Sequence, residues 1–155
     1  MAGTPRTLRM YGQPSGHEPL DWEWVREQLE SAGLYWVIPV GTGYPHPRPV
    51  WGIWLNDELH LSIGSPVIRA ALAENPRLTV HLECGTDVVI VEGRIIPQPT
   101  TDAAVLAAYD AKYDWQYDAD AYGPISRIAP DTVMAWRTAG WAGRESFQQT
   151  GSWAF

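Results

Sequence analysis

One group of residues in this sequence carries side chains suited to holding an anion. An arginine heads the stretch RPVWGIWL, hydroxyls and a glycine end the stretch ELHLSIGS, and a second arginine lies one turn into the helix that should follow. Arginine makes bidentate contacts to phosphate, and a helix N-terminus attracts negative charge. The candidate anion-binding residues are Arg48, Ser62, Gly64, Ser65 and Arg69.

A predicted hairpin brings this group together. Asn56-Asp57 is turn chemistry between two β-type runs, and a register about this pair sets Val50 opposite Ile63. Arg48 then lies close to the residues that follow Ile63. The prolines on either side of Arg48 cannot donate ladder hydrogen bonds, so the strand should begin at a sheet edge.

Each member of the group also has an ordinary structural role open to it. Ser65 can cap its helix, Arg48 can pair with an acid, and Arg69 can lie on a solvated helix face. The residues alone leave both interpretations open.

Other kinds of catalytic or metal site have little support. The sequence contains no GxSxG, P-loop, GxGxxG or HExxH motif, and its four histidines have no ligand spacing. Cys84 is the only cysteine, and we expect it to be a buried or half-buried packing residue. We therefore expect no metal.

Length, net charge and composition limit the class of protein. The 155 residues fit one domain, and a net charge of -7, with ten arginines and one lysine, disfavours attraction to nucleic acid or an anionic membrane. No apolar run approaches the ~18 residues of a membrane span, and the first residues lack a signal segment, so we expect a soluble, cytoplasmic protein. Nine tryptophans and seven tyrosines suit a flat conjugated ligand or a large protein interface as well as a core.

The elements that position these residues are short. Residues 1–18 have little apolar periodicity and should form a flexible leader, which leaves a single domain over residues 19–155. Helices are predicted from Pro19 to a C-cap at Gly33, from Pro66 to Asn75, and from Thr101 to Tyr113 with Thr100 or Thr101 as cap.

Strands are predicted at 34–40, 48–55, 58–63, 77–83, 87–96 and 132–138. The run VVIV in the fifth of these lacks polar alternation and should be buried on both faces. Successive hairpins predict an antiparallel barrel with helices at its margins. The acidic, aromatic segment 110–122 has no clear period and could form a lid, and the terminal GSWAF should dock on the fold.

A resemblance to a known family rests on three stretches in succession. They are HPRPVWGIW, LHLSIGSPVIRAALAENPRLTVHLE and DVVIVEG. Together they resemble the pyridoxamine 5'-phosphate oxidase-like split-barrel superfamily, in particular its actinobacterial flavin/deazaflavin oxidoreductase branch. The likeness covers about residues 34–96 and continues more loosely to GSWAF, similar to the RWxF ending of many members. It implies a mainly β fold, a six-stranded antiparallel split β-barrel of the FMN-binding type with short flanking helices.

The resemblance also implies a function and a site. Members are homodimers that hold FMN or the deazaflavin F420 at the subunit interface and transfer hydride, here to a small unsaturated or aromatic compound. The cofactor-binding positions implied are Arg48, Pro49, Val50, Trp51, Ser62, Gly64, Ser65 and Arg69, with Trp153 and Phe155 contributed across the interface. On an alternating strand Trp51 and Trp54 fall on opposite faces, so only one of them should meet a ligand.

One departure from the family pattern bears on the activity. Many relatives carry SxKARNLxxNPR, with a lysine and an arginine that grip phosphate, where this chain has Ile68 and Ala70. Losing one charge-assisted contact costs on the order of 1.5 to 3 kcal/mol, so cofactor affinity falls about tenfold or more unless Arg69 takes over. The alternative hypothesis is therefore a non-catalytic split-barrel protein that binds a cofactor or haem, and a third is a purely structural dimer.

Overall fold

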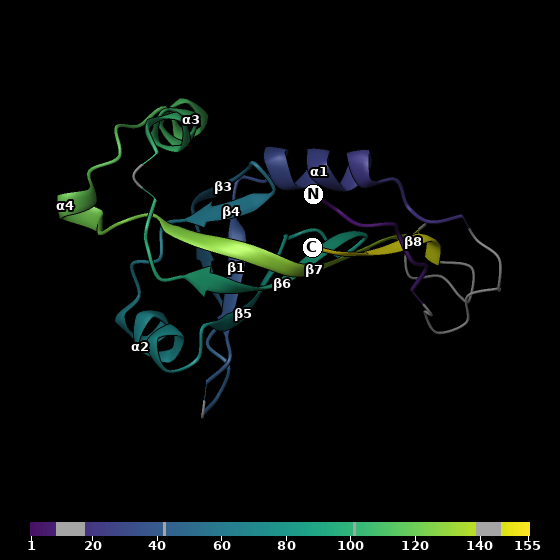
Figure 1. Cartoon of the computed structure of the whole chain (residues 1–155), viewed down its shortest axis with the longest axis horizontal. Coiled ribbons are helices and arrows are strands. Elements are labelled where there is room, and N and C mark those ends of the chain that lie inside the picture. Colours follow the sequence, from purple (N-terminus) through teal and green to yellow (C-terminus); the bar gives the residue numbers. More distant parts are fainter. Residues whose placement is uncertain (9–17, 42, 101, 139–146) are drawn as a thin grey trace.

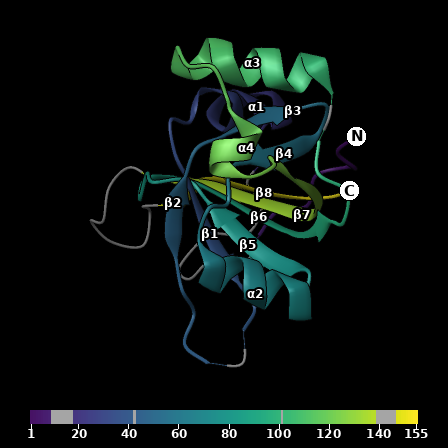
Figure 2. The same cartoon turned by 90° about the vertical axis from the view of Figure 1, so that its left-hand side faces the viewer.

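The structure, a computed structural model, describes residues 1–8, 18–41, 43–100, 102–138 and 147–155. An antiparallel sheet curls into a barrel with α1 along one side, α3 above, α2 below and α4 in front of the strands between them (Figures 1 and 2). The helices are α1 (Trp22–Ser31), α2 (Pro66–Glu74), α3 (Ala103–Tyr113) and α4 (Ala119–Tyr122). The strands are β1 (Tyr35–Pro39), β2 (Arg48–Val50), β3 (Gly52–Leu55), β4 (Glu58–Leu61), β5 (Arg77–His81), β6 (Asp87–Ile96), β7 (Ser126–Thr138) and β8 (Phe147–Ala154).

The barrel is nearly closed because its two edge strands are neighbours in the chain. The strand order is β2-β1-β5-β6-β7-β4-β3, with β8 added to β7. Trp51 alone separates β2 from β3. The run from Arg48 to Leu55 was predicted as one strand and is two, because its first half pairs with β1 and its second half with β4. Counting β2 and β3 as one interrupted strand gives the six predicted barrel strands, and β8, which was not predicted as a strand, is an addition to them.

The predicted hairpin register is confirmed for β3 and β4. Asn56 and Asp57 have φ values of 55° and 60°, as a tight two-residue hairpin turn requires. Gly52 pairs with Leu61, so the register about the turn is the predicted one. It ends at Trp51, however. Val50 pairs with Tyr35 of β1 and not with Ile63, since β2 turns away to the other edge of the sheet.

The helix ends differ from prediction where a stronger cap lies nearby. The carboxylate of Asp21 accepts from the Glu23 N–H at 3.1 Å, so α1 begins after Asp21 and not at Pro19, and its C-cap is Ala32 in place of Gly33. Asp102 caps α3 and accepts from the Ala104 N–H at 2.8 Å. Aspartate here replaces the predicted Thr100, and Thr101 lies outside the described residues. The bounds of α2 are as predicted.

Two apolar clusters hold the elements together. The larger fills the barrel and takes in the inner faces of α1 and α2. A smaller one lies between α3 and the barrel wall, and its buried members are Ile53, Val105, Tyr109 and Ile125. Strand β6 alternates buried Val89 and Val91 with half-buried Val88 and Ile90, so the prediction that it is buried on both faces is wrong. Cys84 is exposed in the β5–β6 turn, which corrects the expected packing role.

The N-terminal residues lie along β8. The N–H of Gly3 donates to the Ala154 carbonyl at 2.9 Å, and Arg6 exchanges backbone hydrogen bonds with Ser152. The prediction that this segment stays outside the fold is therefore wrong for these residues, while residues 9–17 lie outside the described part. The division at residue 18 stays a prediction. The docking of GSWAF is confirmed, since it forms the end of β8 and Phe155. Within the described residues, every helix is too short or too polar to cross a membrane.

Candidate functional site

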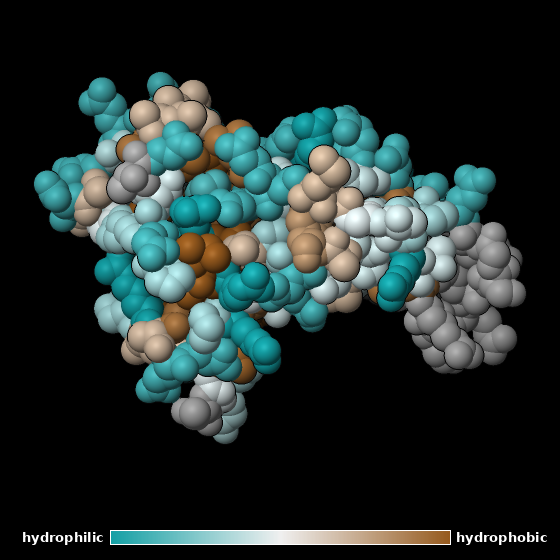
Figure 3. Space-filling view, in the orientation of Figure 1, coloured by the Kyte–Doolittle hydropathy of each residue, from teal (hydrophilic) through white to brown (hydrophobic). Residues whose placement is uncertain are grey.

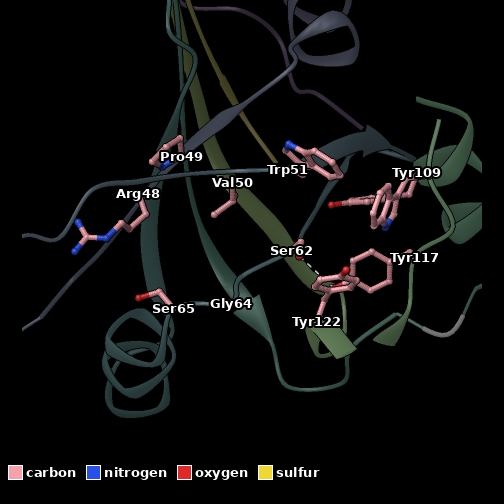
Figure 4. Close-up of a pocket in the computed structure, with 11 residues that line it drawn as sticks. Arg48, Pro49, Val50, Trp51, Ser62, Gly64, Ser65, Tyr109, Tyr117 and Tyr122 are labelled. Carbon is pink, nitrogen blue, oxygen red and sulfur yellow. Dashed lines mark hydrogen bonds between the residues drawn. The ribbon is translucent and has the colours of Figure 1, made fainter. Parts of the chain in front are cut away.

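A cavity of about 420 Å³ lies where the edge strand β2, the connection from β4 to α2, and the segment from α3 to α4 meet (Figure 4). It gathers seven of the ten predicted cofactor-binding residues and four tyrosine and tryptophan residues that were not among them. The lining residues are Arg48, Pro49, Val50, Trp51, Ser62, Gly64, Ser65, Tyr109, Trp115, Tyr117 and Tyr122.

One end of the cavity is polar. Ser65 is the N-cap residue of α2, but its hydroxyl makes no capping hydrogen bond. Arg48 stands beside it on β2, with its guanidinium turned away from the cavity (Figure 4) and Nη1 donating to the Pro47 carbonyl at 2.9 Å. This end therefore offers a hydroxyl that makes no capping hydrogen bond, the N-terminus of a nine-residue helix, and an exposed arginine.

The opposite end is aromatic. The Trp51 ring stacks on Tyr113 with centroids 4.6 Å apart and an interplanar angle of 2°, and Trp115 meets Trp51 edge-on at 6.3 Å. Trp51 is 42% exposed and lines the cavity, whereas Trp54 is 5% exposed and lies in the barrel core. The two side chains therefore lie in different surroundings, and contact of Trp51 with a ligand stays a prediction.

Hydroxyl groups line the middle of the cavity. The Tyr117 hydroxyl donates to the Gly123 carbonyl at 2.6 Å and lies 3.2 Å from the Ser62 hydroxyl, which can donate to it in turn. The Tyr109 hydroxyl is buried and has no hydrogen-bond partner among the described residues. Burial raises the pKa of Tyr109, so the hydroxyl keeps its proton. Buried polar groups are normally paired, so this hydroxyl is an exception among the described residues, although the Ser62 side chain lies near enough to lower its pKa.

The segment over the cavity is fastened to the open edge of β3. The ammonium of Lys112 donates to the Gly52 carbonyl at 3.0 Å and to the Tyr35 hydroxyl at 3.1 Å. The Tyr113 hydroxyl accepts from the Gly52 N–H at 2.8 Å and lies 3.0 Å from the Gly33 carbonyl. Burial lowers the pKa of Lys112 to about 8. These contacts satisfy edge groups that a neighbouring strand would otherwise take.

Arg69 does not reach the cavity. Its Nε donates to the Ile63 carbonyl at 2.6 Å and its Nη2 to the Tyr122 carbonyl at 3.4 Å. Its guanidinium packs against Gly123, where an added Cβ would collide with it. Arg69 thus ties α2 to α4 and borders a separate apolar groove of about 410 Å³. Figure 3 shows apolar residues gathered on this face between the positions of α2 and α3.

The two C-terminal aromatics are also elsewhere. Trp153 is 1% exposed in the barrel core and packs on Trp22 at 5.3 Å, so it cannot extend to a partner chain. Phe155 packs on Trp22 and Trp54. Burial of Trp153 argues against its predicted contact with a partner's cofactor, whereas the predicted contribution of Phe155, which is half-buried, stays a prediction.

Sequence reasoning missed the tyrosines and the tryptophan that the α3–α4 segment brings to the cavity. The signal for them was the aromatic content of residues 110–122, and the suggestion of a lid agrees with their position beside the cavity. The described residues hold no cluster of histidine, cysteine and acidic side chains able to bind a metal.

No family model and no curated protein matches the sequence. Solved structures do match the fold. A FAD-binding protein from Mesorhizobium loti superposes with a TM-score of 0.58 and 16% identity over 88% of this chain and 96% of that one. An F420 reductase superposes with a TM-score of 0.56 and 16% identity over 78% of this chain and 98% of that one. The chain has the pyridoxamine 5'-phosphate oxidase-like split-barrel fold.

A third structure with this split-barrel fold is a Clostridium acetobutylicum protein related to general stress protein 26 of B. subtilis, of the pyridoxinephosphate oxidase family. It has a TM-score of 0.55 and 14% identity over 74% of this chain and 87% of that one. The predicted split barrel is thus confirmed, and identities of this size concern the fold alone.

Proposed function

We propose that the cavity binds a flavin-type cofactor, FMN or F420, and that the protein is an oxidoreductase that transfers hydride to a small unsaturated or aromatic compound. The observation that carries this proposal is the polarity of the cavity, with Ser65 and Arg48 at one end and Trp51 at the other. Proteins of the same fold include ones described as FAD-binding and as F420 reductase.

The polar end fits a phosphate. The unbonded Ser65 hydroxyl and the N-terminus of α2 supply donors, and Arg48 adds a charge-assisted contact once its side chain turns inward. Arg69 is already engaged with two carbonyl groups, so Arg48 is the cation expected to hold the phosphate. Affinity then depends heavily on this one residue.

The aromatic end and the hydroxyls fit a conjugated ring. Trp51 and Trp115 offer stacking surface, and the Tyr109 hydroxyl offers an unused donor to a ring heteroatom or carbonyl. A flavin-type group supplies the hydride chemistry when bound, and the protein supplies position and electrostatics. The α3–α4 segment places Trp115 and Tyr122 beside the ring's position. No catalytic acid–base pair is required by this scheme.

We also propose a homodimer formed through the outer face of the sheet. Paired positions on successive strands carry outward-facing side chains in one row, which begins at the exposed Pro49 of the cavity lining and continues through half-buried residues. The row continues through Trp36, His81, Ile90 and Met134. A second copy on this face would border both cavities.

The dimer is tested by sedimentation velocity. Ile90→Glu places a charge in the row and should yield monomers, whereas Val67→Glu, at an exposed position on α2, should leave the dimer intact. A wild-type chain that sediments as a monomer at tens of micromolar contradicts the dimer.

A non-catalytic binder is the second candidate, and the engagement of Arg69 by carbonyl groups favours it. Weak phosphate binding would suit a carrier of haem or another planar ligand. The distinguishing assay presents the protein and reduced cofactor with quinones, enones and nitro compounds. Oxidation above the protein-free rate supports the oxidoreductase, and its absence despite saturable binding supports the carrier.

Binding itself is tested by titrating the purified protein with FMN, F420 and haem while following tryptophan fluorescence and the visible spectrum. The proposal expects saturable quenching with FMN or F420, reduced in Trp51→Leu. Absence of saturable quenching with either one overturns the proposed cofactor. Saturable binding of haem alone selects the carrier.

A further inference from the structure

A second cavity, of about 470 Å³, lies on the outer wall of the barrel beneath the start of α3. Outward-facing residues of β4 and β7, the β3–β4 turn, and the connection from β6 to α3 form its walls. Its lining residues are Asn56, Glu58, His60, Gln98, Pro99, Thr100, Asp102, Val105 and Arg127. None of them lines the aromatic cavity, so this is a separate place in the molecule.

His60 is the unusual member of this lining. Its side chain is 3% exposed, and neither ring nitrogen has a hydrogen-bond partner among the described residues. The nearest charged oxygen, Oε2 of Glu58, is 3.9 Å from Nε2, beyond hydrogen-bond reach. The Leu55 backbone carbonyl lies near enough to the ring to raise its pKa, but at least the acceptor nitrogen is left unpaired, which destabilises the fold, and an apolar side chain would avoid that cost. A ligand that pairs with the ring gives the residue a reason to be there.

The charges around His60 indicate what such a ligand is. Glu58 and Arg127 neutralise each other through a bidentate pair with N···O distances of 2.9 to 3.1 Å. The Asp102 carboxylate faces the positive N-terminal end of α3, which it caps. Burial lowers the pKa of His60, with Arg127 acting in the same direction and Glu58, the Leu55 backbone carbonyl and Asp102 opposing, so the ring is neutral at pH 7. The two carboxylates disfavour an anion, and Arg127 and the helix end disfavour a cation.

We propose that this cavity binds an uncharged ligand carrying a carboxamide group, which donates to one nitrogen of His60 and accepts from the other groups of the wall. A neutral imidazole presents one donor and one acceptor, and the side-chain amides of Asn56 and Gln98 each present both. Pro99 and Val105 supply an apolar surface for the body of the ligand.

Three probes with the same ring and different charge test the proposal. They are benzamide, benzoate and benzylamine, each titrated at pH 7.5 into ¹⁵N-histidine-labelled protein while the ring nitrogens are observed by NMR. His60→Leu assigns the resonances. Benzamide should shift the His60 nitrogens saturably, and the two charged probes should bind at least ten times more weakly. No saturable shift with benzamide, or equal binding of a charged probe, overturns the proposal.

Two variants keep the test independent of folding defects and of the other cavity. Gln98 is exposed at the rim, so Gln98→Trp should block entry and abolish the benzamide shift, while Trp51→Leu should leave it unchanged. A shift that persists in Gln98→Trp overturns the assignment to this cavity. His60→Leu should also raise the midpoint of thermal unfolding, and His46→Leu, at an exposed histidine, should not. A lower midpoint for His60→Leu shows that the ring is paired already and removes the premise.

Discussion

The hydroxyl of Tyr113 fastens the segment that covers the candidate site, and removing it should measurably destabilise the protein. Gly52 is the first residue of β3, and in the hairpin register its backbone groups face away from β4. Its N–H donates to the Tyr113 hydroxyl at 2.8 Å. Tyr113→Phe keeps the ring that stacks on Trp51. It removes this acceptor and also the O–H that lies 2.8 Å from the Gly52 carbonyl and 3.0 Å from the Gly33 carbonyl. The Gly52 carbonyl keeps the ammonium of Lys112.

The magnitude follows from what is left unpaired. One backbone N–H at a buried glycine loses its partner, which costs about 2 kcal/mol. For a domain of this size that free energy lowers the unfolding midpoint by about 4 to 8 °C. A value near the upper end means that the covering segment also loosens, since Tyr113 meets Gly33 as well.

The assay is thermal unfolding followed by far-ultraviolet circular dichroism, with urea unfolding at 25 °C as a second measure. Tyr44→Phe is the matched control, because Tyr44 is 88% exposed. If the midpoint of Tyr113→Phe stays within about 1 °C of the Tyr44→Phe midpoint, the hydroxyl does not satisfy the strand edge and the reasoning is wrong.

Three further predictions concern Lys112 and the two tryptophans. The folded pKa of Lys112, about 8, lies below its ordinary value of 10.5, so between these pH values the unfolded chain binds a proton that the folded chain does not, and stability rises with pH. The half-exposed position reduces the expected rise in unfolding free energy from roughly 3 to about 1 kcal/mol. Lys112→Met should remove this rise when urea unfolding is compared at pH 8 and pH 10. If the unfolding free energy of Lys112→Met changes with pH as in the wild type, the burial effect is contradicted. Trp54→Leu should cost about 2 to 4 kcal/mol in urea unfolding because it empties part of the core, and a loss below about 1 kcal/mol contradicts that placement. Trp51→Leu should change stability little and weaken cofactor quenching, and undiminished quenching contradicts its place at the ring.

The sequence predicted the parts of the fold that local chemistry controls. The turn at Asn56-Asp57 and the helix signals of Ser65 and Pro66 act through neighbouring backbone, so both hairpin register and helix bounds followed. The predicted gathering of Arg48 to Trp51 with Ser62, Gly64 and Ser65 beside one cavity is observed, but pairing with β1 and not the hairpin register places Arg48 to Val50.

The sequence could not predict features that depend on long-range packing. The break at Trp51 arises because two halves of one β-type run find different partners on opposite sheet edges. Arg69 could equally well face a ligand or a carbonyl, and only the position of α4 decides that it meets Tyr122. Trp153 is an aromatic residue of the kind that often contacts a ligand, yet the path of β8 buries it in the core.

The aromatic residues that line the cavity could not be predicted from the sequence for the same reason. Residues such as Tyr117 and Tyr122 lie in a segment without clear period, and the position of Tyr117 is set by contacts with residues far away in the chain, including Ser62. The sequence shows that aromatic residues are plentiful in this segment, but the contacts that orient their side chains come from the barrel.

The most direct test of the proposed site compares the affinities of FMN and riboflavin, which share the ring and differ in the phosphate. The account predicts that FMN binds at least about ten times more tightly, and that Arg48→Ala reduces this preference by about tenfold or more, since a charge-assisted contact contributes about 1.5 to 3 kcal/mol. Arg77→Ala, at an exposed arginine that does not line the cavity, should leave it unchanged. Equal affinities in the wild-type protein, or a preference that survives Arg48→Ala, would contradict a phosphate site at the polar end of the cavity.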